Sequence, residues 1–173
     1  MILFNSYNVG NFIYCAAYFS PNERWVHRNS GDGHYHQYVY ADPAGTLTAV
    51  NPTTDEEITF TKPEGWGDDG FLIDFSERIG WDTITTTADK GITAFAFNPL
   101  PANRELSVEI VKGIETRTIT ATDVRVIIVA IFGKFLANDK EVKSLQHIKL
   151  LPGNSAVVTS NADTVYAIVT SDE

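Results

Sequence analysis

The alternation of apolar and polar residues along this chain predicts strands throughout and no long helix. Apolar residues recur with a period of two in short runs, and turn residues separate the runs every 8–12 positions, which is typical of a β-sandwich or a closed barrel. The run 124–132 is the most apolar and is rich in β-branched residues, so we expect a central strand buried on both faces. Residues 76–80 predict one helical turn closed by glycine. The other predicted strands are two within 2–19, then 24–28, 33–40, 46–50, 57–61, 71–75, 81–87, 92–97, 105–111, 115–120, 142–151, 156–159 and 164–170.

Length and charge add a domain prediction and exclude two kinds of partner. A chain of 173 residues has the size of one β domain, 1–173, in which an acidic front half (1–100) precedes a more balanced half (101–173). The net charge is −9, and residues 1–100 carry 13 acidic against 5 basic residues, so we expect no nucleic-acid partner. No uncharged apolar run reaches the length of a membrane span, so we expect no membrane partner and synthesis in the cytoplasm. The single cysteine, Cys15, lies in an apolar run and is predicted to be a buried free thiol.

Two histidines carry the main candidate chemistry. His34 and His36 are two residues apart in the predicted strand 33–40, so their side chains share one face of that strand. Two imidazoles on one face can reach the same transition-metal ion. A solvated or hydrogen-bonded pair on a half-exposed strand has the same pattern, and the residues alone leave both interpretations open.

A resemblance to cupin-type jelly rolls adds to this picture. In that family an apolar strand ending in glycine is followed by a hairpin, a Pro-Gly turn, a strand, a polar turn and a final strand. Residues 126–133, 138–139, 151–154, 156–159, 161–163 and 165–169 resemble this order. The His-x-His at His34 and His36 also looks like the first half of the first cupin motif, which supplies two metal ligands. The resemblance implies an all-β, cupin-like jelly-roll sandwich or barrel with long loops and at most short helices.

Other expected ligands of the cupin pattern are missing. The family places a glutamate three or four residues after the second histidine, where this chain has Tyr40 and Ala41. It places a third histidine shortly after the Pro-Gly turn, and residues 154–161 contain none. His27 or His147 can complete a site only if the tertiary structure brings one of them to the pair. We therefore expect a scaffold without catalytic residues or a cofactor, with a divalent transition metal as the alternative.

Three functions follow from these observations. The first is a non-enzymatic β-sandwich that acts as a structural or interaction protein, such as a decoration, neck or tail component of a phage virion. This protein would act through self-association, so we expect a homo-oligomer. The alternative is a metal-dependent cupin enzyme, an isomerase or dioxygenase acting on a small polar substrate. A second alternative is a carbohydrate-binding module in which Trp66 or Trp81 stacks on a sugar ring. The aromatic candidates for an interaction surface are Trp25, Tyr35, Trp66 and Trp81.

Overall fold

The computed structural model consists of strands in two compact units. It describes residues 2–28, 38–41, 45–61, 70–78, 80–89, 92–101 and 104–171. Contacts within the chain cluster into unit 1 (Met1–Asn103) and unit 2 (Arg104–Glu173). In these described ranges the only helical element is the 3-10 turn η1 (Ser76–Arg78), which lies within the predicted helical turn. None of the described residues forms a helix long and apolar enough to cross a membrane.

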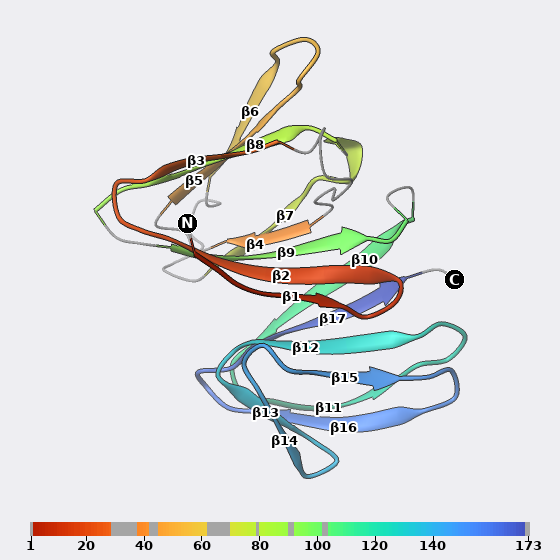
Figure 1. Cartoon of the computed structure of the whole chain (residues 1–173). Coiled ribbons are helices and arrows are strands. Elements are labelled where there is room, and N and C mark those ends of the chain that lie inside the picture. Colours follow the sequence, from red (N-terminus) through yellow and green to blue (C-terminus); the bar gives the residue numbers. More distant parts are fainter. Residues whose placement is uncertain are drawn as a thin grey trace. The chain divides into compact units, whose positions relative to one another are not determined.

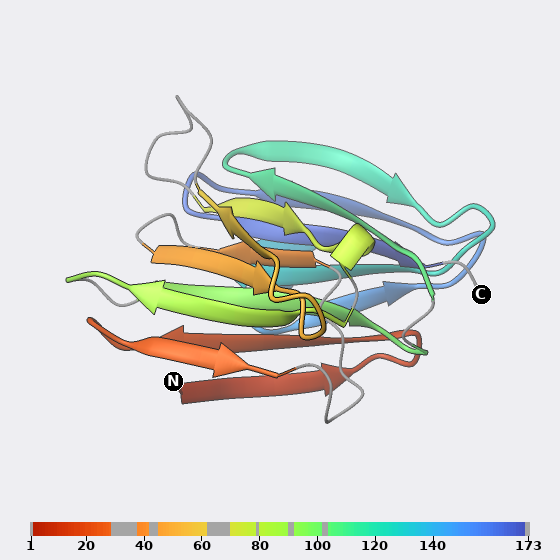
Figure 2. The same cartoon turned by 90° about the horizontal axis from the view of Figure 1, so that it is seen from above.

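Unit 1 is a sandwich of two antiparallel sheets (Figure 1). The strands of the five-stranded sheet are, in spatial order, β1 (Ile2–Asn8), β2 (Phe12–Phe19), β9 (Ile92–Pro99), β4 (Tyr38–Ala41) and β7 (Phe71–Asp74). The four-stranded sheet has the order β3 (Arg24–His27), β8 (Asp82–Thr87), β5 (Gly45–Val50) and β6 (Glu57–Phe60). The long strands β1 and β2 lie side by side in the view from above (Figure 2).

Unit 2 has two four-stranded antiparallel sheets. One has the order β10 (Leu106–Lys112), β17 (Val165–Ser171), β12 (Val126–Phe132) and β15 (His147–Leu150). The other has the order β11 (Glu115–Thr120), β16 (Ser155–Ser160), β13 (Lys134–Ala137) and β14 (Lys140–Lys143).

The two units have the same topology. If β2 to β9 are matched in order with β10 to β17, both pairs of sheets show an identical strand order, and β1 is an additional edge strand in unit 1. Eight antiparallel strands in this order form the two Greek keys of a jelly roll. The predicted cupin-like jelly-roll fold is therefore confirmed, and the sheets form sandwiches rather than closed barrels.

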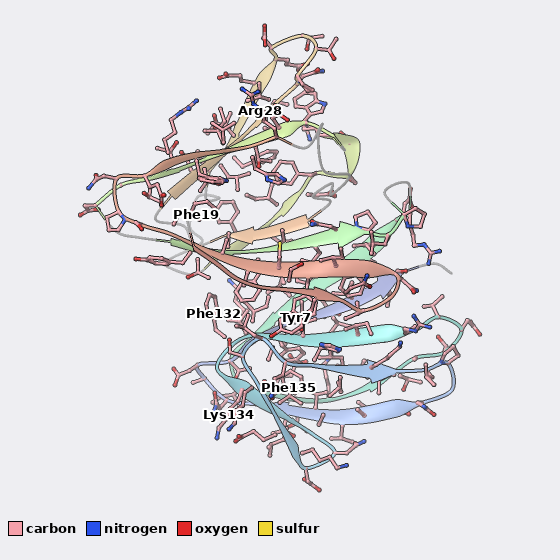
Figure 3. The ribbon with its side chains drawn as sticks, in the orientation of Figure 1. Tyr7, Phe19, Arg28, Phe132, Lys134 and Phe135 are labelled. Atoms are coloured by element: carbon pink, nitrogen blue, oxygen red, sulfur yellow. The ribbon has the colours of Figure 1, made fainter. Side chains whose placement is uncertain are left out.

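The core of unit 2 shows why its strands are readable from sequence. Every residue of β12 except Phe132 is buried, as predicted for a strand covered on both faces. β16 alternates strictly between exposed and buried residues, as expected for a strand with one buried face. Phe135 and Tyr166 fill the space between the two sheets, with ring centroids 5.3 Å apart, and Figure 3 shows Phe135 in this interior. Unit 2 is thus filled by its own large apolar side chains.

The topology also corrects how the cupin resemblance was applied to the chain. The segment 124–170 covers β12 to β17 of unit 2, whereas the His-x-His precedes β4 of unit 1. The two parts of the resemblance therefore belong to different jelly rolls. The strand of unit 1 that corresponds to β16 is β8, so the residue to compare with the third family histidine lies in β8 and not after Pro152-Gly153.

Candidate functional site

One rim of unit 1 brings together the ends of several strands that are distant in sequence. His27, the last residue of β3, lies directly opposite Thr83 near the start of β8. Tyr38, the first residue of β4, lies opposite Asp74 at the end of β7. The connection between Asp74 and β8 contains only η1 and a few flanking residues, so the paired ends of both sheets lie at the same rim. Strand β3 ends at this rim with His27, and β4 begins there with Tyr38.

Threonines form a row on the inner face of β8. Thr83, Thr85 and Thr87 are buried, whereas Thr86 between them is exposed. Thr83 lies opposite Ala49, a fully buried member of the unit 1 core, so the buried threonines face the interior of the sandwich. This arrangement places hydroxyl groups among apolar core residues.

The last threonine of this row, Thr87, has a structural role. The Thr87 hydroxyl donates to the Ser20 carbonyl (2.6 Å) and accepts from the Glu23 backbone N–H (2.8 Å). Those bonds tie the end of β8 to the turn before β3. Thr83 and Thr85 share the inner face with Thr87 and lie closer to the rim at which β8 begins. Their hydroxyls therefore supply polar groups nearer the rim.

The opposite inner face of unit 1 has small residues where β2 and β9 pair and large ones, such as Phe19 and Phe71, beside them. Cys15 and Ala17 of β2 lie opposite Ala96 and Ala94 of β9, and all four belong to or pack against the unit 1 core. Burial raises the pKa of the Cys15 thiol to about 11, while a backbone hydrogen bond with Ala96 lowers it in part. The thiol is therefore protonated at neutral pH, and the predicted free cysteine is confirmed, although its side chain is partly rather than fully buried.

The corresponding strands of unit 2 carry larger or mostly apolar inner residues, with the buried Ser160 of β16 as a polar exception whose hydroxyl donates to the Gly113 carbonyl (2.7 Å). β17, the counterpart of β9, contributes Tyr166 and Ile168 where β9 contributes alanines. β16, the counterpart of β8, contributes Ala156 and Val158 to the core. The three buried threonines of β8 are therefore matched in β16 by a single buried hydroxyl, that of Ser160.

The predicted site residues fall into two groups. His34, His36, Tyr35 and Trp66 lie outside the described residues. His27 shares the inner face of its sheet with Thr83, because residues directly opposite each other in an antiparallel pair point to the same side. Its Nε2 atom is shielded from solvent. Arg28, the next residue, extends to the outer side of this sheet, whereas Phe19 lies between the two sheets (Figure 3).

His147 is positioned differently. It is the first residue of β15 in unit 2, and its neighbours Ile148 and Leu150 are the residues of that strand that pack into the unit 2 core. Alternation along the strand therefore directs His147 to the outer face. Partial burial and nearby Lys149 lower the pKa of His147. Of the two candidate third ligands, only His27 faces the interior of its own unit.

The described tryptophans of the predicted interaction surface also differ. Trp25 on the edge strand β3 is 37% exposed and lies opposite Thr85. Trp81 is partly buried and packs against the unit 1 core, with the Arg78 guanidinium carbon 5.8 Å from the centre of its ring. Neither the threonine row nor Arg78 was identified from sequence. A Thr-x-Thr-x-Thr pattern in a predicted strand was the available signal for the first, whereas nothing in the sequence marks Arg78.

Two further observations delimit the site. No group of three or more His, Cys, Asp or Glu side chains that could hold a metal ion occurs among the residues the structure describes. A shallow hollow on the outer face of β13 and β16 in unit 2 is bordered by the exposed side chains of Leu136 and Val157, and Asp139 is its single ionisable residue. This hollow offers no acid and base pair for catalysis.

Comparisons with solved structures identify similar folds. The chain is similar to AerE from Microcystis aeruginosa (TM-score 0.61, 9% identity, covering 97% of this chain and 91% of that chain). It is similar to the pirin YhhW from Escherichia coli in complex with nickel(II) (TM-score 0.56, 8% identity, covering 96% and 94%). It is also similar to oxalate decarboxylase from Bacillus subtilis (TM-score 0.57, 8% identity, covering 94% and 68%). No protein-family model matches the chain, and neither does any curated protein. These cupin-type structures, at such low identity, show the fold alone.

The comparisons overturn the first functional hypothesis. The chain was expected to be a non-enzymatic structural protein, such as a virion component. The solved structures described above, which share its fold over nearly its whole length, are instead cupin-type proteins; oxalate decarboxylase is an enzyme by name, and the pirin YhhW holds nickel. The hypothesis was wrong because a uniform β pattern with an incomplete ligand motif is common to both classes, and sequence pattern does not separate them.

Proposed function

We propose that the chain is a cupin-type metalloenzyme that acts on a small polar molecule as an isomerase or dioxygenase, with its active site in unit 1. His34 and His36 would be two ligands of a divalent transition metal, and His27 would be the third. Cytoplasmic location is part of this proposal. Three protein ligands with open positions for substrate are the usual arrangement of a catalytic transition-metal site.

The observation that carries this proposal is the position of His27. Its side chain is on the inner face of the four-stranded sheet, at the rim where β3 ends and β4 begins. His36 precedes Tyr38 by two residues, so the covalent reach of the chain keeps their Cα atoms within about 7 Å of each other. An inward imidazole at this rim, together with a His-x-His motif that immediately precedes β4 in sequence, supports the proposal.

The three histidine imidazoles are suitable ligands for a transition-metal ion. Neutral imidazoles bind first-row transition metals such as iron, nickel and zinc, and the missing carboxylate at Tyr40 or Ala41 leaves a set of three histidines. When bound, such a metal supplies Lewis-acid or oxygen-activating chemistry. The chain itself would contribute the hydroxyls of Thr83 and Thr85 for orienting a polar substrate.

Metal analysis of protein purified without a histidine tag and without chelator tests the proposal. We expect about one equivalent of a transition metal per chain, and loss of that metal in the His34→Ala/His36→Ala double variant. His27→Ala should weaken metal binding at least about tenfold, because it removes one of three ligands. His147→Ala is the matched control and should retain the full metal content.

Two results would contradict the proposal. One is a metal content below about 0.2 equivalents even after reconstitution with iron, nickel, manganese or zinc. The other is a metal content that stays the same in the double variant. Circular dichroism spectra of all variants establish that a loss of metal is not a loss of fold.

A further inference from the structure

Arg78 lies at the end of a rigid turn beside the interior of unit 1. The turn η1 follows β7, and its backbone is fixed by the bonds Arg78 N–H to Phe75 carbonyl (2.7 Å) and Trp81 N–H to Arg78 carbonyl (3.0 Å). The Asp74 carboxylate accepts the N–H of Ser76 (2.7 Å), and Phe75 is almost completely buried in the core. The start of the Arg78 side chain is therefore held in one position.

The guanidinium group of Arg78 lies within cation–π distance of two aromatic rings. Its central carbon lies 5.8 Å from the centre of the Phe60 ring and 5.8 Å from the centre of the Trp81 ring. Phe60 lies opposite Leu47, a buried core residue, so its ring is on the inner face of the four-stranded sheet. Phe60 also packs edge-on against Phe75, with ring centroids 5.0 Å apart. The cation thus borders the apolar interior of unit 1.

The charge of Arg78 is not neutralised by any acidic side chain that the structure describes. No ion pair joins it to a described carboxylate, although residues 1–100 contain 13 acidic residues and its neighbours in sequence include Glu77 and Asp82. A guanidinium held against aromatic faces keeps its N–H groups at the edge of its plane available. Those groups match a carboxylate in a bidentate geometry.

We propose that Arg78 is the anchor for a carboxylate group, and that the ligand of unit 1 is a small carboxylic acid with an apolar or aromatic body. The carboxylate would pair with the Arg78 guanidinium, and the body of the ligand would lie against Phe60 and Trp81. This inference rests on the proposed function for the role of the ligand as substrate. It names the substrate class of that same site.

Calorimetric and NMR titrations with acetate, benzoate and cinnamate test the proposal, and benzamide is the uncharged counterpart of benzoate. We expect at least one carboxylate to bind at millimolar concentration and benzamide to bind at least about tenfold more weakly than benzoate. Arg78→Gln should weaken carboxylate binding at least about tenfold, since it removes a charge-assisted pair of hydrogen bonds. Arg78→Lys should restore part of the affinity, because it keeps the charge but loses the bidentate geometry.

Arg24→Gln is the matched control, because Arg24 is an exposed arginine of the same unit. The Arg24→Gln variant should bind the carboxylates as tightly as the unaltered protein does. The proposal is overturned if none of the three carboxylates binds, or if Arg78→Gln binds them as tightly as the unaltered protein does. If Arg78→Gln does not fold, the benzoate and benzamide comparison on the unaltered protein decides instead, and equal affinities overturn the proposal.

A titration of the His34→Ala/His36→Ala variant separates this inference from the proposed function. Carboxylate binding that requires Arg78 and persists in this variant shows that the anchor does not depend on metal, and if the unaltered protein also holds no metal after reconstitution, the anchor is supported while the metalloenzyme is contradicted. A metal-loaded protein whose benzoate affinity does not depend on Arg78 supports the metalloenzyme while overturning the anchor.

Discussion

Replacing Gly133 with alanine should destabilise unit 2 more than the same replacement at two other glycines of that unit. Gly133 joins β12 to β13 with φ of +67°, and a Cβ atom there would lie 2.7 Å from the Asp163 carbonyl oxygen and 3.2 Å from the Asp163 carbonyl carbon. Gly113 and Gly153 have φ of +80° and +84°, but a Cβ atom on either would meet no atom within 4 Å. The three positions thus share the backbone cost and differ in the collision.

The magnitudes follow from these two terms. A side chain in the left-handed region costs about 1–2 kcal/mol, and we expect this cost alone for Gly113→Ala and Gly153→Ala. At Gly133 the obstacle is backbone, so the turn at Asp163 must move. The neighbouring Thr164 is buried, and its hydroxyl donates to the Lys134 carbonyl (2.7 Å), so a shift of the turn also disturbs this bond. Overpacking of this kind adds about 1–3 kcal/mol, which gives about 2–5 kcal/mol for Gly133→Ala.

Urea unfolding measures the difference, provided that the probe reports on unit 2. All three tryptophans belong to unit 1, so tryptophan fluorescence follows that unit, and far-UV circular dichroism together with amide exchange of β12 and β13 follows unit 2. The midpoint of unit 2 should fall furthest for Gly133→Ala. If the three variants lose equal amounts of unfolding free energy, the close approach of Asp163 to Gly133 is refuted.

Three further predictions concern side chains. The Tyr166 hydroxyl is buried and has no hydrogen-bond partner among the described residues, and burial raises its pKa to about 12. Tyr166→Phe should therefore raise the unfolding free energy, measured by thermal or urea unfolding, by about 1 kcal/mol. A loss of stability would contradict this prediction. Thr87→Val should lower the unfolding free energy by about 1–3 kcal/mol, because it leaves the Glu23 N–H and the Ser20 carbonyl without their hydrogen-bond partner. Thr86→Val, on the exposed face of the same strand, should change the unfolding free energy by less than about 0.5 kcal/mol. Equal effects of the two substitutions would be inconsistent with the hydrogen bonds described. Arg117 donates a hydrogen bond of 2.8 Å to each carboxylate oxygen of Glu109, and these bonds lower the pKa of Glu109 in the folded state. The pair therefore stabilises the protein at pH values above the unfolded-state pKa of about 4.3. This contribution is lost as the pH falls through the folded-state pKa. Glu109→Gln should therefore be slightly less stable at pH 7, by less than about 1 kcal/mol for a pair this exposed, and equally stable at pH about 2; a deficit that persists in acid would argue against the ion pair.

The expected homo-oligomer stays a prediction. Light scattering coupled to size-exclusion chromatography would test it independently of the site.

Local pattern was sufficient to predict most strands and the fold class. The buried run of β12, the alternation of β16 and the single turn η1 are properties of consecutive residues, since the side-chain period of a strand and the choice of turn residues are local. The cupin-like jelly roll follows from the order of such elements.

The tertiary structure alone decided which strands pair, and therefore which residues share a site. Pairing between strands far apart in sequence showed that the same jelly-roll order occurs twice, and that the His-x-His and the segment 124–170 belong to different copies. It also placed His27 opposite Thr83, and the guanidinium of Arg78 against two rings from separate elements. Contacts of this kind depend on register across the sheet and on the path of the chain between strands, and neither is encoded in the periodicity of a single segment.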